Sequence, residues 1–224
     1  MIIYEVKEMK KGAIFDMDGL MFDTETVWQR CWSEVADEMN LELDPQFRKE
    51  ICGTSGDLMA GIIAKYYHVE DGHAIAKDVK TRVQNYLMEE VIEKPGLREI
   101  LQFFRDNGVR IAVASSSTRG QIQRNLEKTG TAGYIDEIIS GTEIAHGKPA
   151  PDIFLYAAEM LGYDAKDCYV FEDAYNGVRA GAASEAATVM IPDSQEPTDE
   201  MRELAAGIYD SLTDAMKAIQ KGEI

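Results

Sequence analysis

The sequence has no long apolar run and little positive charge. No stretch reaches the roughly 20 apolar residues that a membrane-spanning helix needs, and the apolar run at the N-terminus is too short for a secretory signal peptide. We therefore expect a cytoplasmic protein with no membrane partner. The formal net charge of -17 should repel nucleic acids, so we expect no nucleic-acid partner either.

Cysteine and histidine are scarce, with three residues of each. Cys31, Cys52 and Cys168 are far apart, have no CxxC spacing and lie within apolar patterns, as expected for buried thiols in a reducing compartment. The histidines are not at metal-ligand spacing, which argues against a zinc site.

The remaining composition, with 45% hydrophobic and 28% charged residues, is typical of a globular protein. A length of 224 residues suits one large domain or one domain with a smaller insertion. From residue 95 onward, short strand candidates alternate with helical patterns, which predicts an α/β fold with a Rossmann-like parallel sheet. We expect strands at Ala13–Phe15, Val109–Ala114, Glu137–Ile139, Cys168–Phe171 and Ala187–Met190, and a weaker strand near Gly207–Tyr209.

Three helices in the same region have clear end signals. Apolar residues recur with helical spacing in 96–107, and helical patterns also cover 118–129 and 151–161. Each pattern is followed by a glycine, which is the residue that a helix C-terminus favours.

The segment between the first two strands contains helical patterns and no convincing strand. We therefore predict an α/β core of residues 1–24 and 94–224, interrupted by an all-α cap domain of residues 25–93. Trp28 and Trp32 are one helical turn apart and are expected in the core of the cap domain. The apolar stripes of its helices are expected to be Val27, Cys31 and Val35; Leu58, Ile62 and Tyr66; and Ile75, Val79, Val83 and Tyr86.

Polar residues follow several of the predicted strands. In an open parallel sheet, ligands bind beyond the carboxyl ends of the strands, so these residues should gather at one edge. They are Asp16 and Asp18 after the first strand, Ser115–Ser117 after the second, Lys148 before the helix at 151–161, and Glu172 and Asp173 after the strand Cys168–Phe171.

The carboxylates at this edge predict a magnesium site. Three or four carboxylates near one lysine cannot all remain ionised at low cost unless a hard cation joins them. Mg²⁺ uses few protein oxygens, keeps water ligands and bridges to phosphates, which fits phosphoryl transfer. A carboxylate can also act as a nucleophile while a second group moves protons, and Asp16 and Asp18 could divide these two roles.

Four motifs resemble those of the haloacid dehalogenase superfamily and occur in the order of that family. They are FDMDGLMFDTE, VASSS, HGKPAPDIF and VFEDAYNGVRAG, and the resemblance spans about residues 11 to 192. The sequence is most similar to the β-phosphoglucomutase-like phosphatase branch, which carries a helical cap domain after the first motif. The resemblance implies a Mg²⁺-dependent phosphatase that hydrolyses a small phosphomonoester, such as a sugar phosphate, through an aspartyl-phosphate intermediate.

The resemblance also implies roles for individual residues. Asp16 would be the nucleophile, and Asp18 would be the general acid and base, with its carbonyl also binding Mg²⁺. Ser115 would hydrogen-bond the transferring phosphoryl group, and Lys148 would neutralise charge on that group and on the nucleophile. The other implied roles are metal binding by Asp173 and Glu172, together with Asp16 and Asp18, and a phosphate cradle of backbone N–H groups around Met17, Asp18 and Ser116.

Two departures from the family bear on the reaction. Mutase members have a histidine where Trp28 aligns and a phosphate-binding arginine where Gly56 of the GTSGD loop aligns, so a phosphatase is favoured over a β-phosphoglucomutase-like phosphomutase. Dehalogenases proper lack the second acid of the first motif, so Asp18 argues against dehalogenation. A non-catalytic phosphometabolite-binding protein is the third alternative, although every motif residue is present. We expect a monomer.

Several of these residues also have ordinary structural explanations. The acids after the first strand could form a solvated turn. Ser115 and Ser117 could cap the following helix, and Glu172 could be an ion-pair partner rather than a metal ligand. If the cap domain opens and closes, its hinges are expected near Met21–Asp23 and Glu93–Gly96.

Overall fold

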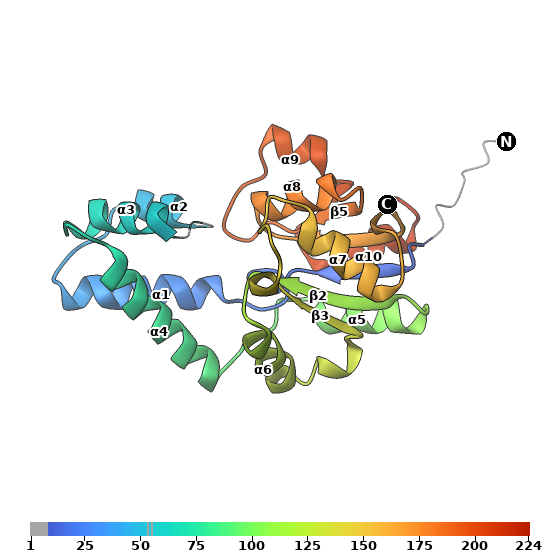
Figure 1. The fold of residues 1–224 in the computed structure, drawn as a ribbon, viewed down its shortest axis with the longest axis horizontal. Helices are drawn as coiled ribbons and strands as arrows, with labels where there is room; N and C mark the ends of the chain where they lie inside the picture. The colour runs from blue at the N-terminus through green and yellow to red at the C-terminus, as the bar shows by residue number, and fades with distance from the viewer. Residues whose placement is uncertain (1–8, 53, 55) are drawn as a thin grey trace. The chain divides into compact units, whose positions relative to one another are not determined.

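A computed structural model describes residues 9–52, 54 and 56–224 (Figure 1). Gly53 and Ser55 of the GTSGD loop lie outside the described residues, as do the first eight residues of the chain. No helix formed by the described residues is both long and apolar enough to cross a membrane.

The chain divides into two compact units. The first unit consists of the residues up to Phe22 together with Glu93–Ile224, and the second is Asp23–Ile92. The first unit contains the sheet, whereas the described residues of the second form helices and no strand.

The described part of the first unit forms one sheet of six parallel strands, in the order β3-β2-β1-β4-β5-β6. The sheet and its helices confirm the predicted α/β, Rossmann-like fold, and every predicted strand is present. β2 and β4 each extend one residue further than predicted, so Ser115 and Glu172 end strands instead of following them. The strands are β1 Gly12–Phe15, β2 Arg110–Ser115, β3 Glu137–Ser140, β4 Cys168–Glu172, β5 Ala187–Met190 and β6 Gly207–Ile208.

β1 lies at the centre of the sheet, and all four of its residues are buried. Its last residue, Phe15, is in register with Val113 of β2 and with Phe171 of β4. Because the strands are parallel, the residues that follow β1, β2, β4 and β5 all reach the same edge of the sheet.

The three helices predicted in this unit are confirmed. Two of them end at a glycine in the left-handed region, Gly130 with φ 68° and Gly162 with φ 84°, as the C-terminal signals predict. The helices of the unit in its described part are α5 Leu97–Asp106, α6 Arg119–Thr129, α7 Asp152–Leu161, α8 Tyr175–Ala183, α9 Asp199–Leu204 and α10 Leu212–Gln220.

Helices α5 and α7 cover opposite faces of the sheet. Phe104 of α5 packs with its ring edge against Phe15, at 6.1 Å between ring centroids. Ile14 is the neighbour of Phe15 in β1, so its side chain faces the other side, where it belongs to a buried cluster with Phe154 of α7. The central strands are therefore buried on both faces, which explains their continuous apolar sequence.

The second unit has an apolar core of its own, which contains Trp32 and, at its margin, Trp28, as predicted. The predicted stripe of Leu58, Ile62 and Tyr66 is wrong at its first residue, because Leu58 is 65% exposed. The side chains that α3 buries are Ala60, Ile63 and Tyr67, each at most two residues further along, because the packing of its neighbours selects that face. The helices of this unit are α1 Glu25–Glu38, α2 Pro45–Ile51, α3 Gly56–Tyr67 and α4 His73–Glu89.

The two segments that connect the units pair with each other. Phe22 and Glu93 form an isolated antiparallel bridge, and the amide of Asp23 donates to the carbonyl of Ile92 at 2.9 Å. These are the segments in which hinges are expected; the hinge motion stays a prediction.

Candidate active site

Asp16 continues β1 into the site. Its amide donates to the carbonyl of Phe171 at 3.0 Å, so the ladder of the sheet fixes its backbone, and its side chain is buried. Gly19 follows with a φ of 89°, a conformation that a residue with a Cβ rarely adopts. The chain can therefore turn back sharply directly after Asp16 and Asp18.

Lys148 connects two of the strand ends. Its Nζ donates to Asp16 Oδ1 at 2.5 Å, to Glu172 Oε1 at 2.6 Å and to the carbonyl of Ala114 at 3.3 Å, and its side chain is only 10% exposed. Burial opposes the charge on Lys148, but the two carboxylates outweigh burial and raise the pKa of the lysine. The lysine is therefore a fixed cation at neutral pH.

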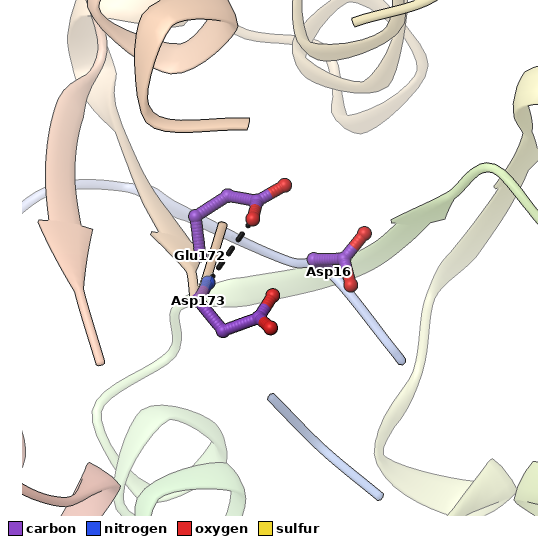
Figure 2. A group of neighbouring side chains, drawn as sticks. All are labelled: Asp16, Glu172 and Asp173. Atoms are coloured by element: carbon purple, nitrogen blue, oxygen red, sulfur yellow. Dashed lines mark hydrogen bonds between the residues drawn. The ribbon is translucent and has the colours of Figure 1, made fainter. Parts of the chain in front are cut away.

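Glu172 uses both of its oxygens within the protein. Oε1 accepts from Lys148, and Oε2 accepts from the amide of Ala174 at 3.2 Å. Oε2 also accepts from the amide of Asp173 at 3.0 Å, the bond that Figure 2 marks. A Cβ at Gly177 of α8 would overlap the Glu172 carboxylate, so this glycine makes room for it. These contacts agree with the interpretation of Glu172 as an ion-pair partner of Lys148. If Glu172 also bound a metal ion, one of these two oxygens would have to contact the ion as well.

Three carboxylates, one from the end of β1 and two from the end of β4, lie close together beside Lys148. Asp16, Glu172 and Asp173 each offer an oxygen, and these oxygens all lie within 4.8 Å of one another (Figure 2). Burial raises the pKa of Asp16 to about 6, partly offset by Lys148 and reinforced by Glu172. Burial also raises the pKa of Asp173 well above its usual value, and the neighbouring acids Glu172, Asp16 and Asp193 add to this effect.

This donor set fits a hard divalent cation. The gathered ligand atoms are all carboxylate oxygens, which Mg²⁺ prefers. Burial is the largest cause of the raised pKa values of Asp16 and Asp173, and the lowering effect of Lys148 offsets only part of it. A cation between the carboxylates would favour their charged forms.

The carboxylate of Asp18 is hydrogen-bonded to two serines at the end of β2. Its Oδ2 accepts from Ser115 Oγ at 3.1 Å and from Ser117 Oγ at 2.8 Å, and the amide of Ser117 donates to Ser115 Oγ at 3.0 Å. The metal contact that the family resemblance implies for Asp18 is through its carbonyl oxygen and stays a prediction. Two hydroxyls thus orient the carboxylate that is the expected acid and base.

The structure does not support the alternative that Ser115 and Ser117 cap the following helix. The N-cap of α6 is Thr118, whose side chain accepts from the amide of Gln121 in a reciprocal capping box. Thr118 therefore satisfies the helix end and leaves the two serines for Asp18. Sequence reasoning did not anticipate the contact between Ser117 and Asp18.

The two residues expected to contribute backbone N–H groups lie in different surroundings. Met17 is buried, with its sulfur 3.8 Å from Asn125 Nδ2, and its backbone hydrogen bond to Asp16 lowers the pKa of that acid. Ser116 is exposed and lines a cavity of about 170 Å³ together with Lys148 and Thr142. Both therefore flank the residues of the site, and their role as a phosphate cradle stays a prediction.

One further acid at this edge was missed. Asp193, three residues after β5, forms an ion pair with Lys94 at 2.5 Å, and its other oxygen is directed toward Gly19. Its segment, IPDSQEPT, has the composition of an ordinary loop, so the sequence alone gave no signal for it.

Comparison with known proteins gives consistent matches. A family model for haloacid dehalogenase-like hydrolases matches residues 10–185. The chain is 32% identical over 179 residues to a fructose-1-phosphate phosphatase of Escherichia coli, covering 79% of this chain and 94% of that protein. It is 28% identical over 180 residues to a β-phosphoglucomutase of Bacillus subtilis, covering 76% and 78%.

A solved structure of a HAD family hydrolase from Deinococcus radiodurans, determined with bound phosphate and sodium, has the same fold. It matches with a TM-score of 0.81 and 26% identity, over 95% of this chain and 96% of that one. The family model covers well over half of the chain, the motifs lie at one sheet edge, and the fold agrees. The protein therefore belongs to the haloacid dehalogenase-like hydrolase family.

Proposed function

We propose that this hydrolase is a Mg²⁺-dependent phosphatase of small phosphomonoesters, in particular sugar phosphates, that works through an aspartyl-phosphate on Asp16. The observation that carries the proposal is the contact of Lys148 with both Asp16 and Glu172, beside a group of three carboxylates at one sheet edge. Asp16, Lys148 and Glu172 come from three separate motifs, and Lys148 lies within hydrogen-bonding distance of both acids.

In the first displacement, an oxygen of Asp16 attacks the phosphorus atom, and the bond from phosphorus to the ester oxygen breaks. Lys148 is placed to balance the charge of the carboxylate before attack and that of the phosphoryl group afterwards. The leaving oxygen takes a proton from Asp18, whose carboxyl group is oriented by Ser115 and Ser117.

In the second displacement, Asp18 takes a proton from a water molecule, whose oxygen attacks the phosphorus atom of the aspartyl-phosphate. The bond between phosphorus and Asp16 breaks, and inorganic phosphate and the free carboxylate are released. The proton from water replaces the one that Asp18 gave to the leaving oxygen, so Asp18 ends the cycle protonated again and the protons balance.

Asp16 and Asp173 are the carboxylates best placed to hold the magnesium ion, because both oxygens of Glu172 already accept hydrogen bonds. The carbonyl of Asp18 is the further ligand expected from the family. When bound, the ion would neutralise charge on the substrate phosphate and help to position it. Glu172 would then act through Lys148, which it holds in place.

The proposed substrate class rests on the similar proteins. The Escherichia coli relative is named as a fructose-1-phosphate phosphatase. The Bacillus subtilis relative is named as a β-phosphoglucomutase, which keeps a phosphomutase as the second candidate. The family resemblance aligns Trp28 and Gly56 with the histidine and the arginine of the mutases, so we favour hydrolysis.

The helical unit Asp23–Ile92 is proposed to act as the cap domain, which excludes bulk water during the first displacement. We further propose that the protein acts in the cytoplasm as a monomer on a free metabolite. The net charge of -17 argues against a nucleic-acid partner, and the small number of cysteines, three in 224 residues, agrees with a reducing compartment.

A phosphate-release screen over sugar phosphates, with and without Mg²⁺, tests the proposal. Wild-type protein should release phosphate from at least one of them only when Mg²⁺ is present, and Asp16→Asn should release none while its circular dichroism is unchanged. Asp167→Asn, an acid in an exposed ion pair with Lys11, is the matched control and should keep full activity. Conversion of a hexose 1-phosphate to a 6-phosphate without phosphate release would favour the mutase, and an active Asp16→Asn protein would exclude the covalent role.

A further inference from the structure

The loop after β5 brings a fourth carboxylate to the edge of the sheet at which the other acids meet. Asp193 Oδ1 is 2.5 Å from Lys94 Nζ, and the side chains of the pair are only 15% and 22% exposed. The second oxygen, Oδ2, is buried and has no hydrogen-bond partner among the described residues. A buried carboxylate oxygen that lacks a partner is costly, so its surroundings matter.

Gly19 shows where this oxygen points. A Cβ built on Gly19 would lie 3.3 Å from Asp193 Oδ2 and would overlap Oδ2 of Asp173. Both carboxylates therefore lie against the same glycine. The strand register agrees, because Glu172 pairs with Met190, so the chain after β5 runs beside the chain after β4.

Two neighbouring carboxylates at a buried edge repel each other unless positive charge lies between them. Lys94 donates its hydrogen bond to Oδ1, and Lys148 is bound to Asp16 and Glu172. A magnesium ion at the cluster would keep part of its water shell, and those waters donate hydrogen bonds. An oxygen with free acceptor capacity next to Asp173 is suited to accept one.

We propose that Asp193 is a positioning residue for the cation site, which contacts the ion through one of its water ligands and divides its negative charge between that site and Lys94. This inference rests on the proposed function only in assuming that the cluster of Asp16 and Asp173 binds Mg²⁺. It assigns a role to a residue outside the four motifs. It also predicts that Lys94 and the ion compete for Asp193.

Mg²⁺ binding to the full-length protein, measured by isothermal titration calorimetry without substrate, tests this inference. Asp193→Asn should weaken Mg²⁺ affinity about tenfold, as expected for the loss of a partner of a metal-bound water. Lys94→Gln should tighten it, because the competing positive charge is gone. Asp136→Asn is the control, since Asp136 is similarly buried beside Arg105 but precedes β3 at the opposite edge, and it should bind Mg²⁺ as wild type does.

Opposite signs for the Asp193→Asn and Lys94→Gln variants support the inference, since a purely structural ion pair would give parallel losses. Parallel weakening, wild-type affinity in Asp193→Asn, or no Mg²⁺ binding by the wild type would each overturn it. Thermal denaturation of each variant identifies any loss of fold. If Asp193→Asn does not fold, the Mg²⁺ affinity of Lys94→Gln decides the test, because that variant keeps all the acids. Failure of the proposed function is distinguishable, because it would leave Mg²⁺ binding intact and abolish only phosphate release.

Discussion

Replacement of Lys148 by methionine should destabilise the cation-free protein strongly and in a pH-dependent way. The lysine is the partner of two carboxylates whose side chains are 10% and 2% exposed, Asp16 and Glu172. Removal of one partner from a buried ion pair leaves an uncompensated charge and costs about 3 to 5 kcal/mol. Because natural domains have total stabilities of about 5 to 15 kcal/mol, the variant should remain measurable but weak.

The pH dependence of this loss follows from Asp16. Its pKa of about 6 in the folded protein lies above its unfolded value, and the loss of Lys148 should raise it further. A carboxyl group with a raised pKa binds protons on folding, so its contribution to stability falls as pH rises through that pKa. The difference between variant and wild type should therefore be largest at pH 8 and smaller at pH 5, where Asp16 is neutral in the variant.

Urea denaturation in the presence of a chelator measures this difference at both pH values. Lys11→Met is the matched control, because Lys11 is 63% exposed in its ion pair with Asp167 and should contribute at most about 1 kcal/mol. The double variant Lys148→Met/Glu172→Gln should recover part of the loss, since it removes one of the two unpaired charges. Equal stability of Lys148→Met and Lys11→Met at pH 8 would refute the electrostatic account of the site.

Three further predictions concern the geometry around this centre. Gly177→Ala should lower stability by about 1 to 3 kcal/mol and impair turnover, because the new Cβ overlaps the Glu172 carboxylate. Gly120→Ala in α6 has open space around it and should be neutral or stabilising when both variants are compared by thermal denaturation. Ser117→Ala should reduce kcat about tenfold with little change in KM, since it removes one of the hydroxyls that orient Asp18, and an unchanged kcat would contradict that role. Mg²⁺ affinity, measured by calorimetry, should fall as pH drops below about 6, because protons then compete with the ion for Asp16; a flat profile from pH 7 to pH 5 would contradict this.

The sequence predicted those parts of the fold that local patterns determine. The strands were recognisable because a strand buried on both faces is a short, continuous apolar run, and Gly130 and Gly162 mark helix ends. Since parallel strands end at one edge, the spacing of the motifs was also enough to place Asp16 near Asp173.

The remaining parts depend on contacts between residues that are far apart in the sequence. Ser117 and Asp18 are 99 residues apart, and only the arrangement of β1 and β2 makes them partners. Asp193 lies in a loop without a motif, so its relation to Gly19 is a consequence of the order of β4 and β5. The predicted stripe of α3 was wrong at Leu58, whereas Ile62 and Tyr66 pack against the core. Two adjacent faces of α3 are both apolar, and packing against α2 and α4 selects between them.

The pairing of the two connecting segments bears on how the chain can be assembled and changed. An insertion of this length would cost the α/β unit about 4 kcal/mol in closure entropy if it were a flexible loop. The two ends of the helical unit are joined by the hydrogen bond from Asp23 to Ile92. Once this unit has folded, its ends already lie side by side, so the α/β unit does not bear that entropy cost. We therefore expect the length and sequence of this insert to be changeable without a change in the strand order around β1.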